Sequence, residues 1–463
     1  MLVRRISGGA LLALGALALV GFASDGSQPR VASAQQIGEG SCIGTDACTG
    51  NTGDVGANSC IGVEACRDNS GEVGDNSCVG GSACQGNSGD LGDNSCNGGT
   101  GACYSNSGGV ANNSCHATIV CRWNSGDVHE NSCSGYAACD ANTDHVGLGS
   151  CNGPRDYYPT DTCKGNSGDI GDHSCNGDRV CSGNGGRVAD NSCSDGYDSC
   201  YLNVGAVDEN SCNGINACES NTGDIGANSC NHHAPCRGNR GQVGDNSCSL
   251  LDAAGGAYAC ELNTGTVGDD SCNGQSTCGL NNADVGARSC NGFQACVENS
   301  GSIGRKSCND FEACRDNSGP VGDHSCNAFE ACEGNSNDVG KRSCNGEAAC
   351  RVNQGYVEDG SCNANFACPG NVGYVGDQSC IGFNACAENS GRVGDRSCHG
   401  DDAACDSNSG TVGDGSCIGS RACFQNGGDI GKGSCNGYEA CEGNTAVIEK
   451  KQCIGDHACD NRP

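Results

Sequence analysis

Residues 60–77 read CIGVEACRDNSGEVGDNS, and this eighteen-residue pattern recurs along nearly the whole chain. The 46 cysteines form 23 consecutive pairs, and the second cysteine of one pair stands twelve positions before the next pair at all 22 junctions. Within a pair the spacing is six positions in eighteen cases, seven in three and twelve in two. The unit is therefore an eighteen-residue repeat that accepts insertions in one segment only. Such regularity predicts a tandem array in which each repeat contacts its neighbours instead of a central core.

The composition excludes a conventional hydrophobic core. Apolar residues make up 35% of the chain even with cysteine counted, and 79 of the 463 residues are glycine. Globular domains usually contain about 45–50% apolar residues. A cysteine content this high is typical of a disulfide-stabilised secreted protein.

Three columns of the repeat are nearly invariant when positions are numbered from the first cysteine. Position 10 is asparagine in 22 of 23 repeats, and we expect its amide to satisfy backbone groups at a turn and to stack from coil to coil, as in parallel β-helices. Position 14 is always valine, isoleucine or leucine in the 22 complete repeats, which suits a short buried strand. Position 18, directly before the next pair, is serine in all repeats except at Gln452 and is never threonine, which indicates a sterically tight, at least partly inward site. Members of the asparagine column include Asn51, Asn69, Asn87, Asn299, Asn317 and Asn444.

These columns predict an all-β fold, namely a single-domain β-solenoid (β-helix) of about 23 coils with eighteen residues per coil. Glycines at positions 12 and 15 mark turns on either side of the short strand. Disulfides are most simply placed within each repeat, because insertions then bulge outward from the closed loop; bridges between coils remain an alternative. The pairs so predicted include Cys42/Cys48, Cys60/Cys66, Cys78/Cys84, Cys151/Cys163, Cys230/Cys236, Cys248/Cys260 and Cys453/Cys459.

The N-terminus indicates export. Arg4 and Arg5 precede an apolar run, and small residues permit cleavage after Ala23 or Ala34. We therefore expect a signal peptide at 1–34, a repeat array at 35–463 and a C-terminal cap from about residue 446. The apolar run is too short for a membrane span, so the mature protein is expected to be secreted without one.

Charge and motifs restrict the functional classes. The formal net charge is −31, which argues against a nucleic-acid partner and is compatible with weak binding of divalent cations. Catalytic and phosphate-binding motifs are lacking in the sequence, and we expect neither an enzyme nor a cofactor. The two long insertions, 152–162 and 249–259, contain Tyr157, Tyr158 and Tyr258, which we interpret as tolerated loop variation.

Two patterns suggest metal sites. His232 and His233 lie between Cys230 and Cys236, but these cysteines keep the spacing of every other pair, so a disulfide with exposed histidines is favoured over zinc. The N-S-G-D-V-G-D segments resemble the calcium-binding β-roll repeats of secreted toxins, which implies at most a few calcium sites. The aspartates at position 13 are Asp54, Asp90, Asp127, Asp169, Asp224, Asp284, Asp338 and Asp429.

The motif S-C-N-G-x-x-A-C resembles the coil of the disulfide-stapled insect antifreeze solenoids. This resemblance covers about eight residues per repeat and implies a flat ice-binding face built from positions 18 and 2. The face would include Ser95, Asn97, Ser150, Asn152, Ser174, Asn176, Ser289 and Asn291.

The sequence therefore predicts a secreted, non-enzymatic structural or adhesive protein at or beyond the cell surface. Ice binding and calcium binding are the alternatives. Self-assembly of the array is left open by the sequence.

Overall fold

The computed structural model describes residues 35–154, 160–249 and 258–460. The predicted signal peptide with Ala23 and Ala34, the tyrosines Tyr157 and Tyr158, and most of the second insertion lie outside these residues. The chain divides into Met1–Gln35 and Gln36–Pro463, and only the second unit is described below.

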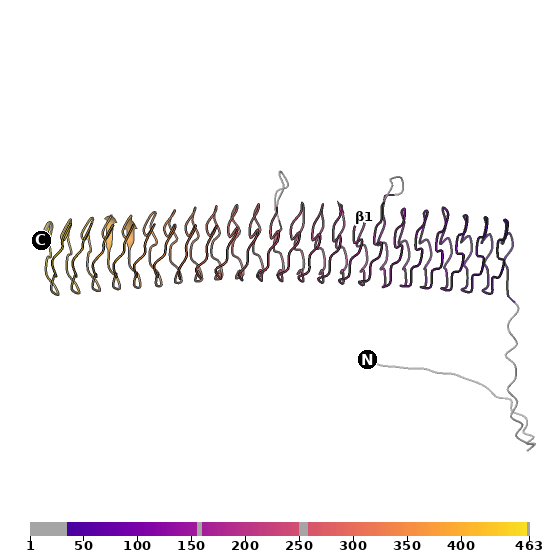
Figure 1. Cartoon of the computed structure of the whole chain (residues 1–463), viewed down its shortest axis with the longest axis horizontal. Helices are drawn as coiled ribbons and strands as arrows, with labels where there is room; N and C mark the ends of the chain where they lie inside the picture. Colours follow the sequence, from indigo (N-terminus) through magenta and orange to yellow (C-terminus); the bar gives the residue numbers. More distant parts are fainter. Residues whose placement is uncertain (1–34, 155–159, 250–257, 461–463) are drawn as a thin grey trace, which may run out of the picture. The chain divides into compact units, whose positions relative to one another are not determined.

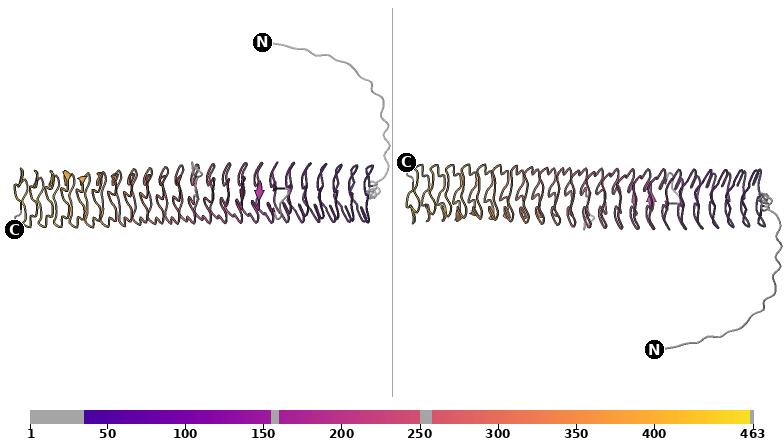
Figure 2. Two further views of the ribbon diagram at one scale, coloured as in Figure 1. Left: turned by 90° about the horizontal axis from the view of Figure 1, so that it is seen from above. Right: turned by 90° about the horizontal axis from the view of Figure 1, so that it is seen from below.

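Within this unit the repeats stack side by side in sequence order (Figure 1, Figure 2). The described residues contain no helix and four short strands: β1 (Gly177–Asp178), β2 (Gly196–Tyr197), β3 (Ile381–Phe383) and β4 (His399–Asp402). Parallel pairing joins β1 to β2 and β3 to β4. This arrangement, with its eighteen-residue period, is compatible with a solenoid.

Single parallel bridges at position 14 connect the repeats. Val55 pairs with Val73, Val73 with Leu91, and the series continues to Ile448. Val73 N donates to Asp54 O of the preceding repeat at 2.9 Å, and Gly74 N donates to Leu91 O of the following repeat at 2.7 Å. Because each repeat bonds in both directions, its backbone is satisfied only inside the stack.

Glycine at position 12 is required by close packing between repeats. A Cβ atom placed on Gly71 would lie 2.0 Å from Gly89 O in the next repeat. This glycine therefore serves the close approach of two backbones in addition to the predicted turn.

The apolar part of the buried interior consists of the cysteines, the position 14 side chains and a column of small residues at position 6, of which Ala65 is one. Many cysteines occupy the left-handed region, as Cys60 (φ 59°) and Cys66 (φ 51°) do. The second cysteine adopts two peptide orientations along the chain. Cys66 N donates forward to Ala83 O at 2.8 Å, whereas Cys350 N donates backward to Ala331 O at 2.7 Å. Both orientations are possible because the repeat before and the repeat after each present the carbonyl of a position 6 residue to this N–H group.

Candidate functional site

The cysteines are all engaged in disulfides, and every bond closes within one repeat. Cα–Cα separations are 5.5 Å for Cys60–Cys66 and 5.7 Å even for the insertion pair Cys151–Cys163. No free cysteine is left. Sulfur atoms of neighbouring repeats lie as close together as the ligands of a metal ion would. Sulfurs in disulfides are not thiolates, however, and do not act as such ligands. The other predicted pairs are bonded likewise: Cys42–Cys48, Cys78–Cys84, Cys230–Cys236, Cys248–Cys260 and Cys453–Cys459.

The asparagines at position 10 form one continuous ladder from Asn51 to Asn444, here called the asparagine ladder. Asn69 Nδ2 donates to Asn51 Oδ1 at 2.7 Å and to Gly71 O at 2.7 Å. The same two bonds recur at Asn87, Asn299 and Asn317. Both amide hydrogens and the amide oxygen are used inside the stack, and all members except Asn51 are completely buried. The ladder therefore has no polar group left for a ligand.

The serines at position 18 also bond inside the stack. Ser59 Oγ donates to Gly74 O of the next repeat at 2.7 Å and accepts from Ser77 N at 3.1 Å. The column is completely buried from Ser59 to Ser434. An added methyl would have to fit into this closed interior, which agrees with the absence of threonine.

This burial places half of the sequence-predicted ice-binding face inside the molecule. Ser95, Ser150, Ser174 and Ser289 are completely buried. The partner asparagines Asn97, Asn152, Asn176 and Asn291 are half-buried. The four serine hydroxyls are thus unavailable to a surface ligand.

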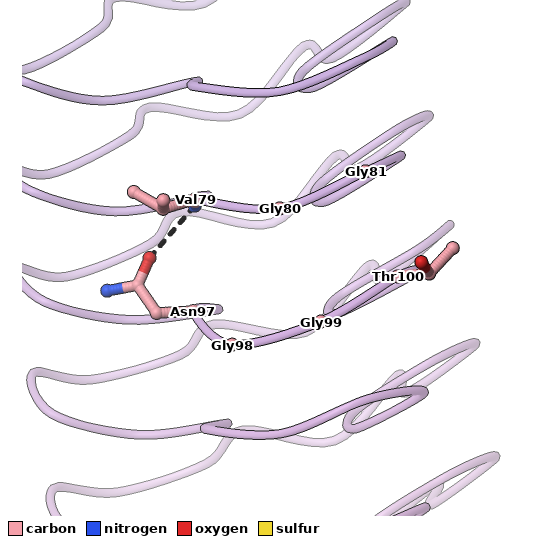
Figure 3. Close-up of a pocket in the computed structure, with 7 residues that line it drawn as sticks. All are labelled: Val79, Gly80, Gly81, Asn97, Gly98, Gly99 and Thr100. Carbon is pink, nitrogen blue, oxygen red and sulfur yellow. Dashed lines mark hydrogen bonds between the residues drawn. The ribbon is translucent and has the colours of Figure 1, made fainter.

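The position 2 asparagines bond to backbone groups of earlier repeats. Asn97 Oδ1 accepts from Val79 N at 2.9 Å, as Figure 3 shows, and its Nδ2 donates to Asn76 O at 2.7 Å. Asn152, Asn176 and Asn291 accept equivalent backbone N–H bonds at 2.9–3.0 Å. A hollow of 610 Å³ lies beside Asn97, and most of its lining residues are glycines. Such a surface contains few side chains that could recognise a ligand.

The aspartates at position 13 are mostly structural acceptors. Asp54 Oδ1 accepts from Gln36 N at 2.8 Å, and Asp90 Oδ1 accepts from Glu72 N at 3.0 Å. Asp127, Asp224, Asp284 and Asp429 do the same. Asp169 and Asp338 differ, because Asp169 faces a histidine ring and Asp338 N bonds to Asn337 Oδ1. One carboxylate oxygen is therefore already bonded in most of the predicted calcium ligands.

His232 and His233 are exposed on the loop closed by Cys230–Cys236. The His233 ring lies edge-on to Tyr258 at a centroid distance of 6.3 Å. The two cysteines bond to each other and are not ligands, so this segment offers only two surface imidazoles.

A group of basic side chains interrupts the acidic surface. Arg305 and Lys341 occupy position 16 two repeats apart, and Lys306 and Arg342 follow them at position 17. These four residues, here called the cationic stripe, are exposed and form no ion pair among the described residues. They border two adjoining hollows of 370 and 600 Å³, and His324 lines both. The stripe was not predicted as a unit from the sequence.

The stripe is continuous because the repeats stack in register. His324 N donates to Arg305 O, and Arg342 N donates to Asp323 O, each at 2.9 Å. Asp323 lies between the basic pairs, and its Oδ1 accepts from Arg305 N at 2.8 Å. The arrangement places four unpaired cations along one edge of three consecutive repeats.

Comparison with known proteins identifies a family of undetermined function. The family described as Domain of unknown function (DUF7640) matches residues 18–119, 71–179, 113–201, 159–275, 252–367 and 364–462. The chain belongs to this family. No curated protein and no solved structure matches it.

The DUF7640 array also contains two neighbouring carboxyl groups with raised pKa values, of which Asp198 is buried and Asp178 is half-buried. Burial raises the pKa of Asp198 above its ordinary value, and the nearby Arg179 guanidinium opposes this effect. Burial likewise raises the pKa of Asp178. Arg179 Nε lies 3.1 Å from Asp198 Oδ1, and its guanidinium also lies over the rings of Tyr197 and Tyr201. The described residues form no helix of the length and apolar character that crossing a membrane requires.

Proposed function

We propose that this DUF7640 protein is a secreted, non-enzymatic β-solenoid that acts as an extended scaffold with an adhesive edge. The asparagine ladder is the observation that carries the proposal. It links 22 repeats through buried amide bonds from Asn51 to Asn444, with one disulfide closing each repeat. Such an interior supports an extended array that resists proteolytic cleavage, since each repeat is held by its neighbours.

The distribution of polar groups supports a non-enzymatic role. Asparagine, serine and most position 13 aspartate side chains are engaged in bonds between repeats. Catalysis requires several unlike groups that converge on one reacting atom. The hollow beside Asn97 is lined mostly by glycines, and the charged side chains that line the hollows at the cationic stripe come from positions 16 and 17 of successive repeats.

The disulfides support secretion. Bonds in this number persist in oxidising compartments and are rare in the reducing cytosol. The predicted signal peptide at 1–34 is consistent with this route.

The cationic stripe supports the adhesive part of the proposal. On a chain with a formal charge of −31, the stripe gathers four exposed cations in three repeats, beside the aspartates Asp269, Asp270, Asp323, Asp359 and Asp377 that line the same hollows. Electrostatic attraction acts within a Debye length of about 8 Å at physiological salt, so the stripe would attract an anionic segment locally although the net charge of the chain repels polyanions. We propose that the polymer bound by the cationic stripe is an acidic extracellular polysaccharide.

Small-angle scattering and limited proteolysis test the scaffold. The oxidised, signal-cleaved protein should have a maximum dimension on the order of 110 Å, from 23 repeats at about 4.8 Å each. It should also resist a protease that digests the reduced protein. A compact particle of ordinary globular dimensions, or equal digestion of both forms, would contradict the scaffold.

Salt-gradient elution from immobilised heparin and polygalacturonate tests the adhesive edge. Neutralising the stripe should abolish retention, with the substitutions Arg305→Ser, Lys306→Ser, Lys341→Ser and Arg342→Ser. A matched control removes four exposed cations elsewhere, with Arg240→Ser, Arg396→Ser, Lys450→Ser and Lys451→Ser. Equal loss of retention in both variants would show that general charge, and not the stripe, binds the polymer.

A further inference from the structure

Two histidines from adjacent repeats bring one ring nitrogen each within hydrogen-bonding distance of the other. His129 Nε2 lies 3.1 Å from His145 Nε2, and the ring centroids are 4.5 Å apart at an interplanar angle of 77°. His129 directly follows Val128, and His145 directly precedes Val146. The Val128–Val146 bridge and the bond from His129 N to Val146 O at 2.9 Å fix this relation. The pair is therefore held by the stack and is not a chance meeting of flexible loops.

A third repeat orients one of the rings. Asp169 Oδ1 lies 3.0 Å from His145 Nδ1, and the Val146–Ile170 bridge places these two residues in the same column. Most aspartates of this column accept a backbone N–H instead, as Asp127 does from Gly109. A carboxylate at Nδ1 favours the tautomer with the proton on Nδ1, which leaves the lone pair on Nε2.

The geometry points to a metal site, and we propose that His129 and His145 bind one divalent transition-metal ion through their Nε2 atoms. Two nitrogens 3.1 Å apart, each about 2.0–2.1 Å from a common ion, subtend about 100° at that ion. This angle lies between the values for square-planar and tetrahedral coordination. Asp169 acts as the positioning carboxylate behind one ligand, an arrangement that recurs in protein zinc sites.

The ligand chemistry selects the ion. Neutral imidazole suits Zn²⁺, Cu²⁺ and Ni²⁺, whereas Ca²⁺ and Mg²⁺ prefer oxygen ligands. Two protein ligands leave the remaining coordination positions to water or to a donor from outside the chain. More than half of the His145 side chain is covered: its exposed fraction is 40%, against 52% for Asp169. The ion would thus sit at the surface, where it links two adjacent repeats, with Asp169 of the next repeat behind one ligand.

Titration calorimetry with ZnCl₂ on the tag-free, oxidised, chelator-washed chain tests the site, with CuCl₂ and NiCl₂ as further probes. We expect one site per chain, and loss of binding in both His129→Gly and His145→Ser. Glycine is the usual residue at position 15 and position 13 is variable, so both variants keep the repeat consensus. His232→Ser with His233→Ser is the matched control and should leave this binding unchanged.

Asp169→Asn separates the positioning role from a structural one. We expect a 10- to 100-fold weaker affinity with unchanged stoichiometry. Acidification should release the ion, because a protonated imidazole is not a ligand. Nitrogen NMR of the rings should show both Nε2 resonances shift on zinc addition. Zinc binding that persists in His129→Gly and His145→Ser, or no binding at all with a simple Nε2–H···Nε2 hydrogen bond between the rings, would overturn the proposal.

Discussion

Asn335 Nδ2 donates to Asn317 Oδ1 across 2.8 Å, and neither side chain has any exposed surface. Asn353 Nδ2 in turn donates to Asn335 Oδ1 at 2.8 Å. Each amide is thus both donor and acceptor between two neighbours. A carboxylate has the same shape but no N–H, so the ladder requires the amide specifically.

The substitution Asn335→Asp should open the array locally. It removes the donors to Asn317 Oδ1 and Asn337 O and buries a charge, at a cost on the order of 3–5 kcal/mol. Hydrogen exchange at the backbone amides of residues 335–353 measures the effect. The control Asn94→Asp changes an exposed asparagine and should leave exchange unaltered. Unchanged protection in Asn335→Asp would mean that the ladder does not hold the repeats together.

The hydroxyl of the buried Ser343 should contribute to the stability of the stack. Ser343 Oγ donates to Glu358 O at 2.8 Å and accepts from Ser361 N at 3.1 Å. Ser343→Ala leaves both groups unsatisfied, which costs about 1–3 kcal/mol. Faster exchange of the Ser361 amide is the expected readout. Ser300→Ala, at an exposed serine, is the control. Equal exchange of the Ser361 amide in the two variants would argue against a stabilising role of the buried Ser343 hydroxyl.

Acid should stabilise the repeats around Asp198. Burial raises the pKa of Asp198 above its ordinary value of 3.8, so the folded chain binds this proton more tightly than the unfolded chain does. The stabilisation is fully present below the ordinary pKa and is lost as the pH rises through the raised pKa. The protection factor of the Asn216 amide, which donates to Tyr197 O at 2.8 Å, should therefore increase from neutral pH toward mild acid.

Asp198→Asn should flatten this pH dependence, because the amide does not titrate. Asp195→Asn changes an exposed carboxyl three residues away and should preserve the dependence. A pH response that survives in Asp198→Asn would assign it to another group, of which Asp178 is the nearest candidate with a raised pKa.

The repeat frame could be predicted from the sequence because internal repetition shows which columns tolerate no change. Nearly invariant asparagine at position 10 and aliphatic residues at position 14 indicated a stacking amide and a short strand. A constant spacing of twelve between pairs, with insertions only inside pairs, favoured bonds within repeats. The structure contains the stacked amides and the disulfides within repeats, whereas position 14 forms single parallel bridges and not strands.

The functional sites on the surface could not be predicted from the sequence in the same way. Serine is tolerated both inside and outside proteins, so its column entered the predicted ice-binding face although it also indicated a tight, inward site. The pair His129 and His145 is invisible without the register, since the two residues stand at positions 15 and 13 and sixteen residues apart. The bridge between Val128 and Val146 is what makes them neighbours.

The serine burial leads to a last prediction, on ice. Antifreeze faces of the insect type require rows of exposed, regularly spaced hydroxyl and methyl groups, whereas Ser289 is buried and Asn291 Oδ1 is bonded to Asn273 N at 3.0 Å. We therefore expect the oxidised, signal-cleaved protein to show no thermal hysteresis and no faceting of ice crystals, with an insect antifreeze protein as the positive control. Hysteresis that disappeared on replacing Asn291 and Asn309 by serine would restore the position 2 column as an ice-binding surface. The half-buried side-chain amides would then have to give up their backbone partners in order to bind ice. Asn291 N would lose its bond to Asn309 Oδ1, at 3.2 Å, and the hydrogen exchange of the Asn291 amide should become faster in the ice-bound protein.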